Sequence, residues 1–292
     1  MSQARTDTNP IVASEIERYL RTGDTDPYHS AWPGQNSIEC ARRAHADLRD
    51  ALLGEIFRRS EGLTFPDLPG PEEIIALTRR KTEPMVCGLF PRAEQDTVLA
   101  LVERSVVFLT PANVGEVLRE ESFDRAAWDL ANLYLGSIGA ELLGPDAPAV
   151  LGISQEATCF VTHAYFDEDD PFADYLVHEV AHIFHNCKRR TAGLPFTRKK
   201  EWMLDIAFRE RETFAWSCEA YARIVERAER FRDRRELAEE FAEHFTTGAD
   251  ERVDPAEVVD IVREASTRRN GWKAILARCA PPKRPRREEV VA

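Results

Sequence analysis

Residues 170–187 read DPFADYLVHEVAHIFHNC, and their apolar side chains recur at every third or fourth position. This is the period of a helix that is packed on more than one side. Asp170 and Pro171 favour a helix start, because the carboxylate can accept from free backbone N–H groups and proline suits the first turn. Gly193 and Pro195 prevent much continuation. The stretch therefore predicts a buried helix.

Residues 178–182 of this helix read HEVAH. A spacing of four places His178 and His182 on one face, about one turn apart, where both imidazoles can reach one metal ion. Glu179 lies about 100° round the helix from His178, beside such an ion. The pattern favours a Zn²⁺ site in which Glu179 takes a proton from zinc-bound water. The alternative is a chance match, with both histidines hydrogen-bonded in a core.

A catalytic zinc needs a third protein ligand and keeps one position for water. His185 follows His182 by only three residues, so we expect it to pack or to hydrogen-bond nearby rather than to ligate. Glu212 and Glu219 are seven residues apart and share one face of a long helix expected at 198–231. Either one can be the third ligand. The alternative for each is a charged, solvated helix face.

The chain here resembles the gluzincin metallopeptidases, in which an HExxH helix is followed by a helical glutamate. Glu212-Thr213-Phe214-Ala215 looks like the Glu-x-Phe-Ala stretch that carries the ligand in the aminopeptidases of that group. The resemblance implies Glu212 as the third ligand, with Glu219 as second choice. It covers about residues 105–230, but the interval of 30 residues from His182 to Glu212 is longer than in those enzymes.

Composition restricts the classes of function. The chain has 292 residues, 43% of them hydrophobic, which is enough for a sizeable core. Its net charge of -12 argues against a general nucleic-acid binder. No segment resembles a signal peptide or a membrane span, so we expect a cytoplasmic protein without a membrane partner. The six cysteines form no C-x-x-C pair and are expected to be reduced.

The pattern along the chain predicts an α+β protein: a zincin-like catalytic domain with a small, mostly antiparallel sheet, preceded by a mainly helical region. We expect a helical N-terminal region at 1–92, the metallopeptidase domain at 93–272 and a basic, disordered tail at 273–292. Residues 83–95 are expected to be irregular. The expected helices are 11–22, 37–59, 72–82, 123–143, 234–246 and 255–268, and the expected strands are 105–109, 149–153 and 159–166.

The sequence also suggests roles for several aromatic residues, one strand and two histidines. Tyr221, His163 and Tyr175 are candidates to stabilise a tetrahedral oxyanion, although each amphipathic ring can be purely structural. The strand expected at 159–166 is a candidate edge for an extended substrate. His29 and His45 are isolated in the sequence and are expected to be surface or capping residues.

The combined expectation is a zinc-dependent metallopeptidase that acts on a peptide or protein substrate. One alternative is a catalytically inactive zincin fold with a regulatory or protein-interaction role. Another is a helical interaction module without a metal, which would use its acidic surface and basic tail. Metal content, proteolysis and the response of thermal stability to a chelator distinguish the three.

Overall fold

The computed structural model describes residues 9–145, 147, 150–198, 200–246 and 252–282. In this part of the chain helices dominate and one three-stranded sheet is present, so the protein is of the mixed α+β class, as predicted. No helix among the described residues combines the length and the apolar character needed to cross a bilayer.

The chain forms two compact units, and neither is continuous in sequence. Of the described residues, the first unit takes those within 1–68, 108–153 and 162–164, and the second takes those within 69–107, 154–161 and 165–292. The sequence predicted a boundary near residue 92 instead. The difference arises because the helix α3 (Pro71–Leu89) packs against α4, α7, α8 and α11 of the second unit.

The first unit is helical. Its helices α1 and α2 lie close to the predicted positions. α1 begins at the Asn9 cap, whose side chain accepts from the Ile11 N–H, and ends at Gly23, where φ is 73°. The predicted helix 123–143 is shorter than expected, and a further short helix precedes it. The bounds are α1 Pro10–Thr22, α2 Ser37–Ser60, α5 Val114–Glu120 and α6 Asp124–Ser137.

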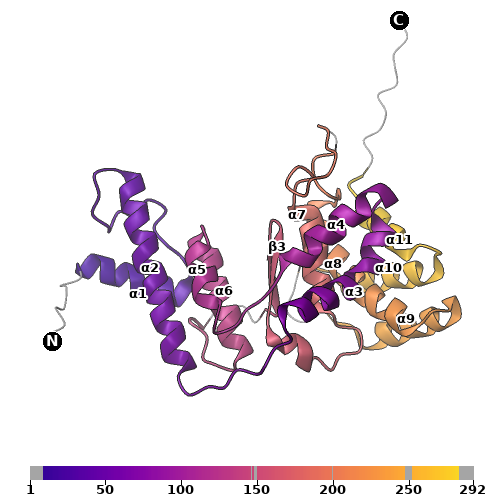
Figure 1. The fold of residues 1–292 in the computed structure, drawn as a ribbon, viewed down its shortest axis with the longest axis horizontal. Coiled ribbons are helices and arrows are strands. Elements are labelled where there is room, and N and C mark those ends of the chain that lie inside the picture. The colour runs from indigo at the N-terminus through magenta and orange to yellow at the C-terminus, as the bar shows by residue number, and fades with distance from the viewer. Residues whose placement is uncertain (1–8, 146, 148–149, 199, 247–251, 283–292) are drawn as a thin grey trace, which may run out of the picture. The chain divides into compact units, whose positions relative to one another are not determined.

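The second unit contains the other helices of the described chain, seen together in Figure 1. α7 packs against α8, and α10 packs against α8, α9 and α11. α10 begins as predicted, with the Asp254 side chain accepting from the Ala256 N–H and Pro255 at the first position. The remaining bounds are α4 Arg92–Ser105, α7 Tyr175–Asn186, α8 Arg211–Arg227, α9 Phe231–His244, α10 Pro255–Thr267 and α11 Gly271–Cys279.

The sheet consists of β1 (Val106–Phe108), β2 (Gly152–Gln155) and β3 (Thr158–Val161), in the order β1-β3-β2. β2 and β3 are joined by two residues and so form an antiparallel hairpin, whose turn holds Glu156 at a φ of 40°. β3 packs against α7. β3 is the central strand with both edges paired, which contradicts its predicted role as a free edge for substrate.

Three predicted segments differ from the structure. Residues 83–95 are not irregular, since α3 continues past Pro84 to bury Met85 and Val86, and α4 follows from Arg92. Residues 273–279 belong to α11, not to a tail, and the segment 283–292 lies outside the described residues. The predicted helix 198–231 is helical only from α8 onward, apart from a short 3-10 turn at Phe208–Glu210.

A loop takes the place of the first part of the predicted helix 198–231, and Arg189, whose side chain is 1% exposed, holds this loop in position. Its guanidinium donates to the backbone oxygens of Pro195 (2.5 Å) and Met203 (3.3 Å) and to the Glu94 carboxylate (2.5 Å). A buried arginine with these partners keeps the loop in place without a helical backbone. This contact links residues far apart in sequence, so local periodicity did not indicate it.

Candidate metal centre

α7 carries the HExxH residues. It begins later than predicted, at Asp174, whose side chain accepts from the Val177 N–H at 3.2 Å. Its apolar residues, including Leu176, Val180 and Ile183, are fully buried. The helix is therefore held on more than one side, as predicted. The imidazole centroids of His178 and His182 are 4.9 Å apart, as their spacing of four residues requires.

α8 brings Glu212 to these two histidines. Its Oε2 lies 3.3 Å from His182 Nε2 and 3.8 Å from His178 Nε2. One ligand atom from each of the three residues lies within 4.8 Å of the other two. Two imidazole nitrogens and one carboxylate oxygen at these separations can surround a single metal ion.

Glu219 lies two turns further along α8 and is not one of the three residues gathered in this cluster. Its Oε2 is 2.9 Å from His178 Nδ1, and its Oε1 accepts from the Asp174 backbone N–H at 2.7 Å. The side chain is only 2% exposed. Glu219 therefore contacts the ring nitrogen of His178 that faces away from Glu212. This contact fixes the orientation of the ring.

His182 has a corresponding outer partner in His185. The distance from His182 Nδ1 to His185 Nε2 is 3.0 Å, and His185 Nδ1 is 3.1 Å from Asn186 Oδ1. The amide oxygen can only accept, so His185 Nδ1 carries the proton and His185 Nε2 accepts from His182 Nδ1. The lone pair of His182 Nε2 is thereby directed to Glu212. Burial lowers the pKa of His185 to about 3, which keeps it neutral.

Glu219 acts in the same way on His178. Its carboxylate can only accept, so it holds a proton on His178 Nδ1, and Nε2 is the nitrogen that can bind a metal ion when the ion displaces the second ring proton. Both imidazoles thus present Nε2 to the same point. Metal ligation would use this nitrogen of each ring, and the orientation of the rings follows from contacts outside the cluster.

The charges of the cluster also favour a cation. Burial lowers the pKa of His178, but hydrogen bonds to Glu212 and Glu219 outweigh it and raise that pKa to about 10. Burial raises the pKa of Glu212, yet its hydrogen bonds to His178 and His182 bring it well below its usual range. The site therefore attracts positive charge between its carboxylates and histidines, and a divalent ion can take the place of a proton. The other Glu212 oxygen pairs with Arg252 at 3.1 Å.

Glu179 lies beside the cluster and is 7% exposed. Burial raises the pKa of its carboxyl above the ordinary value, while the charges of His178 and His182 and a hydrogen bond with Ser154 oppose this. Ser154 belongs to β2. A carboxylate with a raised pKa next to a metal site is suited to accept and return a proton.

Two of the three oxyanion candidates, Tyr221 and His163, have packing contacts in the structure. Tyr221 is 2% exposed and its ring packs edge-on against Trp272, with centroids 4.8 Å apart. Its hydroxyl lies at Gly271, where an added Cβ would be 2.4 Å from it. Tyr221 therefore packs against α11, which is the structural role that the sequence analysis kept as the alternative for this ring. His163 belongs to the first unit, where it contacts Phe65.

Trp216 is a neighbour of the cluster that sequence reasoning missed. Its ring lies edge-on to that of His178, with centroids 4.9 Å apart, and its buried indole Nε1 has no hydrogen-bond partner. Trp216 follows Glu212 by four residues on α8, so helical spacing could have identified it. It covers one side of the His178 ring.

No family model, curated protein or solved structure matches the chain significantly.

Proposed function

We propose that this chain is a zinc-dependent metallopeptidase, with His178, His182 and Glu212 as the zinc ligands and Glu179 as general base. The observation that carries the proposal is the convergence of two Nε2 atoms and one carboxylate oxygen within 4.8 Å, with Glu179 beside them. Two imidazoles and one carboxylate are a common ligand set of catalytic zinc, and they leave a position for water. The resemblance to gluzincins in the HExxH helix and in Glu212-Thr213-Phe214-Ala215 supports the same assignment.

Each residue has a distinct part in this proposal. Zinc bound at the site supplies Lewis-acid activation of a water molecule and of the substrate carbonyl. The Glu179 carboxylate accepts a proton from the attacking water and returns it to the amine that leaves. Glu219 and His185 keep His178 and His182 in the ligating tautomer.

The outer edge of β2 is the proposed binding strand for an extended peptide. β2 is an edge strand of the sheet, and Ser154 on it contacts Glu179. A peptide paired along this edge would hydrogen-bond through its main chain, which suits substrates of varied sequence. This role replaces the one that the sequence suggested for the neighbouring strand.

The decisive variant is Glu179→Gln, assayed for cleavage of a set of fluorogenic peptides and of an unfolded protein. We expect hydrolysis to fall by about 10²–10⁴-fold while bound zinc is retained. Glu243→Gln, on the exposed part of α9, is the matched control and should leave both quantities unchanged.

Hydrolysis at the wild-type rate in Glu179→Gln would refute the assigned base. A wild-type protein that holds zinc yet cleaves neither kind of substrate would refute the peptidase proposal and favour a zincin-like binding module. A protein that takes up no zinc on reconstitution would refute the metal site itself.

A further inference from the structure

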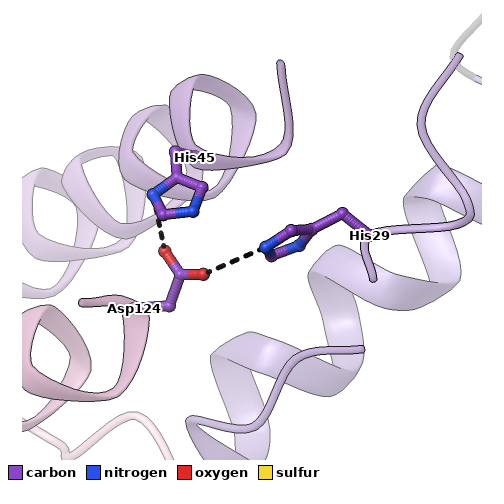
Figure 2. Close-up of side chains that lie close together, drawn as sticks. All are labelled: His29, His45 and Asp124. Carbon is purple, nitrogen blue, oxygen red and sulfur yellow. Dashed lines mark ion pairs between the residues drawn. The ribbon is translucent and has the colours of Figure 1, made fainter. Parts of the chain in front are cut away.

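A second cluster of possible ligands lies within the first unit. His29 comes from the loop after α1, His45 from α2, and Asp124 is the first residue of α6. Figure 2 shows the two imidazoles turned toward the carboxylate. Asp124 Oδ1 is 3.5 Å from His45 Nδ1, and Asp124 Oδ2 is 3.9 Å from His29 Nε2. One ligand atom from each residue lies within 4.8 Å of the others.

These positions contradict the expectation that His29 is an isolated surface or capping residue. His29 is 7% exposed, and its Nδ1 is buried without a hydrogen-bond partner. Its Nε2 is too far from Asp124 for a direct hydrogen bond. The Nε2 atom can therefore reach the carboxylate only through a group that lies between them, whereas the unpartnered Nδ1 is a separate atom that an ion at Nε2 would not satisfy.

The backbone at His29 is held in an unusual conformation. Its φ is 48°, a value that non-glycine residues rarely adopt and that is enriched at functional sites. The surrounding turn maintains it: the His29 N–H donates to Asp26 O at 2.9 Å, and the Trp32 N–H donates to His29 O at 3.1 Å. Trp32 is in turn fixed by its indole N–H, which donates to Asp47. The loop thus aims the imidazole at Asp124.

Asp124 has a competing partner in Arg49, whose Nη1 donates to Oδ1 at 2.8 Å. Both side chains are buried. The Asp124 Oδ2 atom still faces His29, and the Tyr19 hydroxyl holds the Asp124 backbone oxygen at 2.7 Å. The buried Arg49 guanidinium opposes a second cation more strongly than the exposed Arg252 does at Glu212, so we expect an ion here to bind less tightly than one between His178 and Glu212.

We propose that His29, His45 and Asp124 form a second site for a divalent transition-metal ion, for which imidazole and carboxylate are suitable ligands. His29 and His45 are 16 residues apart, and Asp124 follows His45 by 79. The ion therefore ties the loop after α1, α2 and α6 together. Three protein ligands leave one position for water, and the partly exposed His45 side chain gives solvent access to it. This proposal does not depend on the peptidase assignment.

The test is a titration of the full chain with Zn²⁺ and, separately, with Co²⁺. Metal is counted by equilibrium dialysis and elemental analysis, and Co²⁺ coordination is followed by visible absorption. His45→Ala is the main variant, because His45 is the most exposed of the three residues and its removal leaves Arg49 paired with Asp124. His244→Ala, at the exposed end of α9, is the matched control.

We expect two metal equivalents in the wild type and in His244→Ala, the second weaker than the first. His45→Ala and His178→Ala should each bind one, and the double variant none. Thermal unfolding of each variant is measured as well, to establish that a variant that loses a metal equivalent is still folded. Two equivalents in folded His45→Ala, or one wild-type equivalent that disappears in His178→Ala, would overturn the proposal. One equivalent lost in His45→Ala but kept in His178→Ala would support this site and refute the peptidase centre.

Discussion

Replacing Glu219 by glutamine tests whether the contacts around the cluster set its affinity for metal. The carboxylate accepts two hydrogen bonds, from the Asp174 N–H and from His178 Nδ1. Glutamine has the same shape but only one acceptor oxygen. If that oxygen stays with Asp174, the amide NH₂ faces His178 Nδ1 and donates to it. The ring proton then moves to Nε2, the atom that has to ligate the metal.

The magnitude follows from the role of such outer partners. Loss of a hydrogen bond to a ligating histidine typically lowers metal affinity by about 10–100-fold. This corresponds to about 1.4–2.7 kcal/mol of binding free energy. We expect Glu219→Gln near the upper end, because Glu219 is almost fully buried and no water can replace its second oxygen.

The assay is competition for Zn²⁺ against a chromophoric chelator, with Glu243→Gln as control. Glu212→Gln provides the comparison with loss of a direct ligand and should reduce the affinity further. Zinc affinity of folded Glu219→Gln within about twofold of wild type would refute the reasoning. So would a larger loss in Glu219→Gln than in Glu212→Gln, since Glu219 would then be the ligand.

Further predictions concern the same helices. His185→Ala should weaken zinc binding by about tenfold in the chelator assay, because His182 loses its acceptor, and unchanged affinity would contradict this role. Removing zinc with a chelator should lower the midpoint of thermal unfolding, since zinc at 100 times its Kd stabilises the fold by about 2.7 kcal/mol, and an unchanged midpoint would argue against a bound ion. Asp174→Ala should lower the free energy of unfolding in urea by more than about 1 kcal/mol, because it removes both the α7 cap and the partly buried ion pair with Lys81. Gly88→Ala should lower the free energy of unfolding by about 1–3 kcal/mol, because the added Cβ would lie 2.1 Å from the Trp272 ring. A free energy of unfolding equal to that of the wild type would contradict the cap in Asp174→Ala and the contact with Trp272 in Gly88→Ala.

Local pattern predicted the parts of the fold that depend on local physics. Residues close together in the sequence determine the period of α7, the cap and proline of α10 and the bounds of α1 and α2. The division into units was not predictable in this way. It depends on α3 packing with helices that follow about a hundred or more residues later.

The candidate centre shows the same limit. Spacing placed His178 and His182 together and put Glu212 and Glu219 on one face of α8, and both glutamates do lie near His178. Spacing alone could not say which glutamate reaches Nε2 and which reaches Nδ1, because that depends on the relative position of α7 and α8. His29, His45 and Asp124 were missed for the same reason, since they meet only in the folded chain.

Crystals of the zinc-loaded protein, measured on both sides of the zinc absorption edge, test the central claim most directly. We predict an anomalous peak about 2.0–2.2 Å from His178 Nε2, His182 Nε2 and a Glu212 oxygen, with Glu219 hydrogen-bonded to His178. A peak bonded to Glu219 instead, or no peak between α7 and α8 in protein saturated with zinc, would contradict the account.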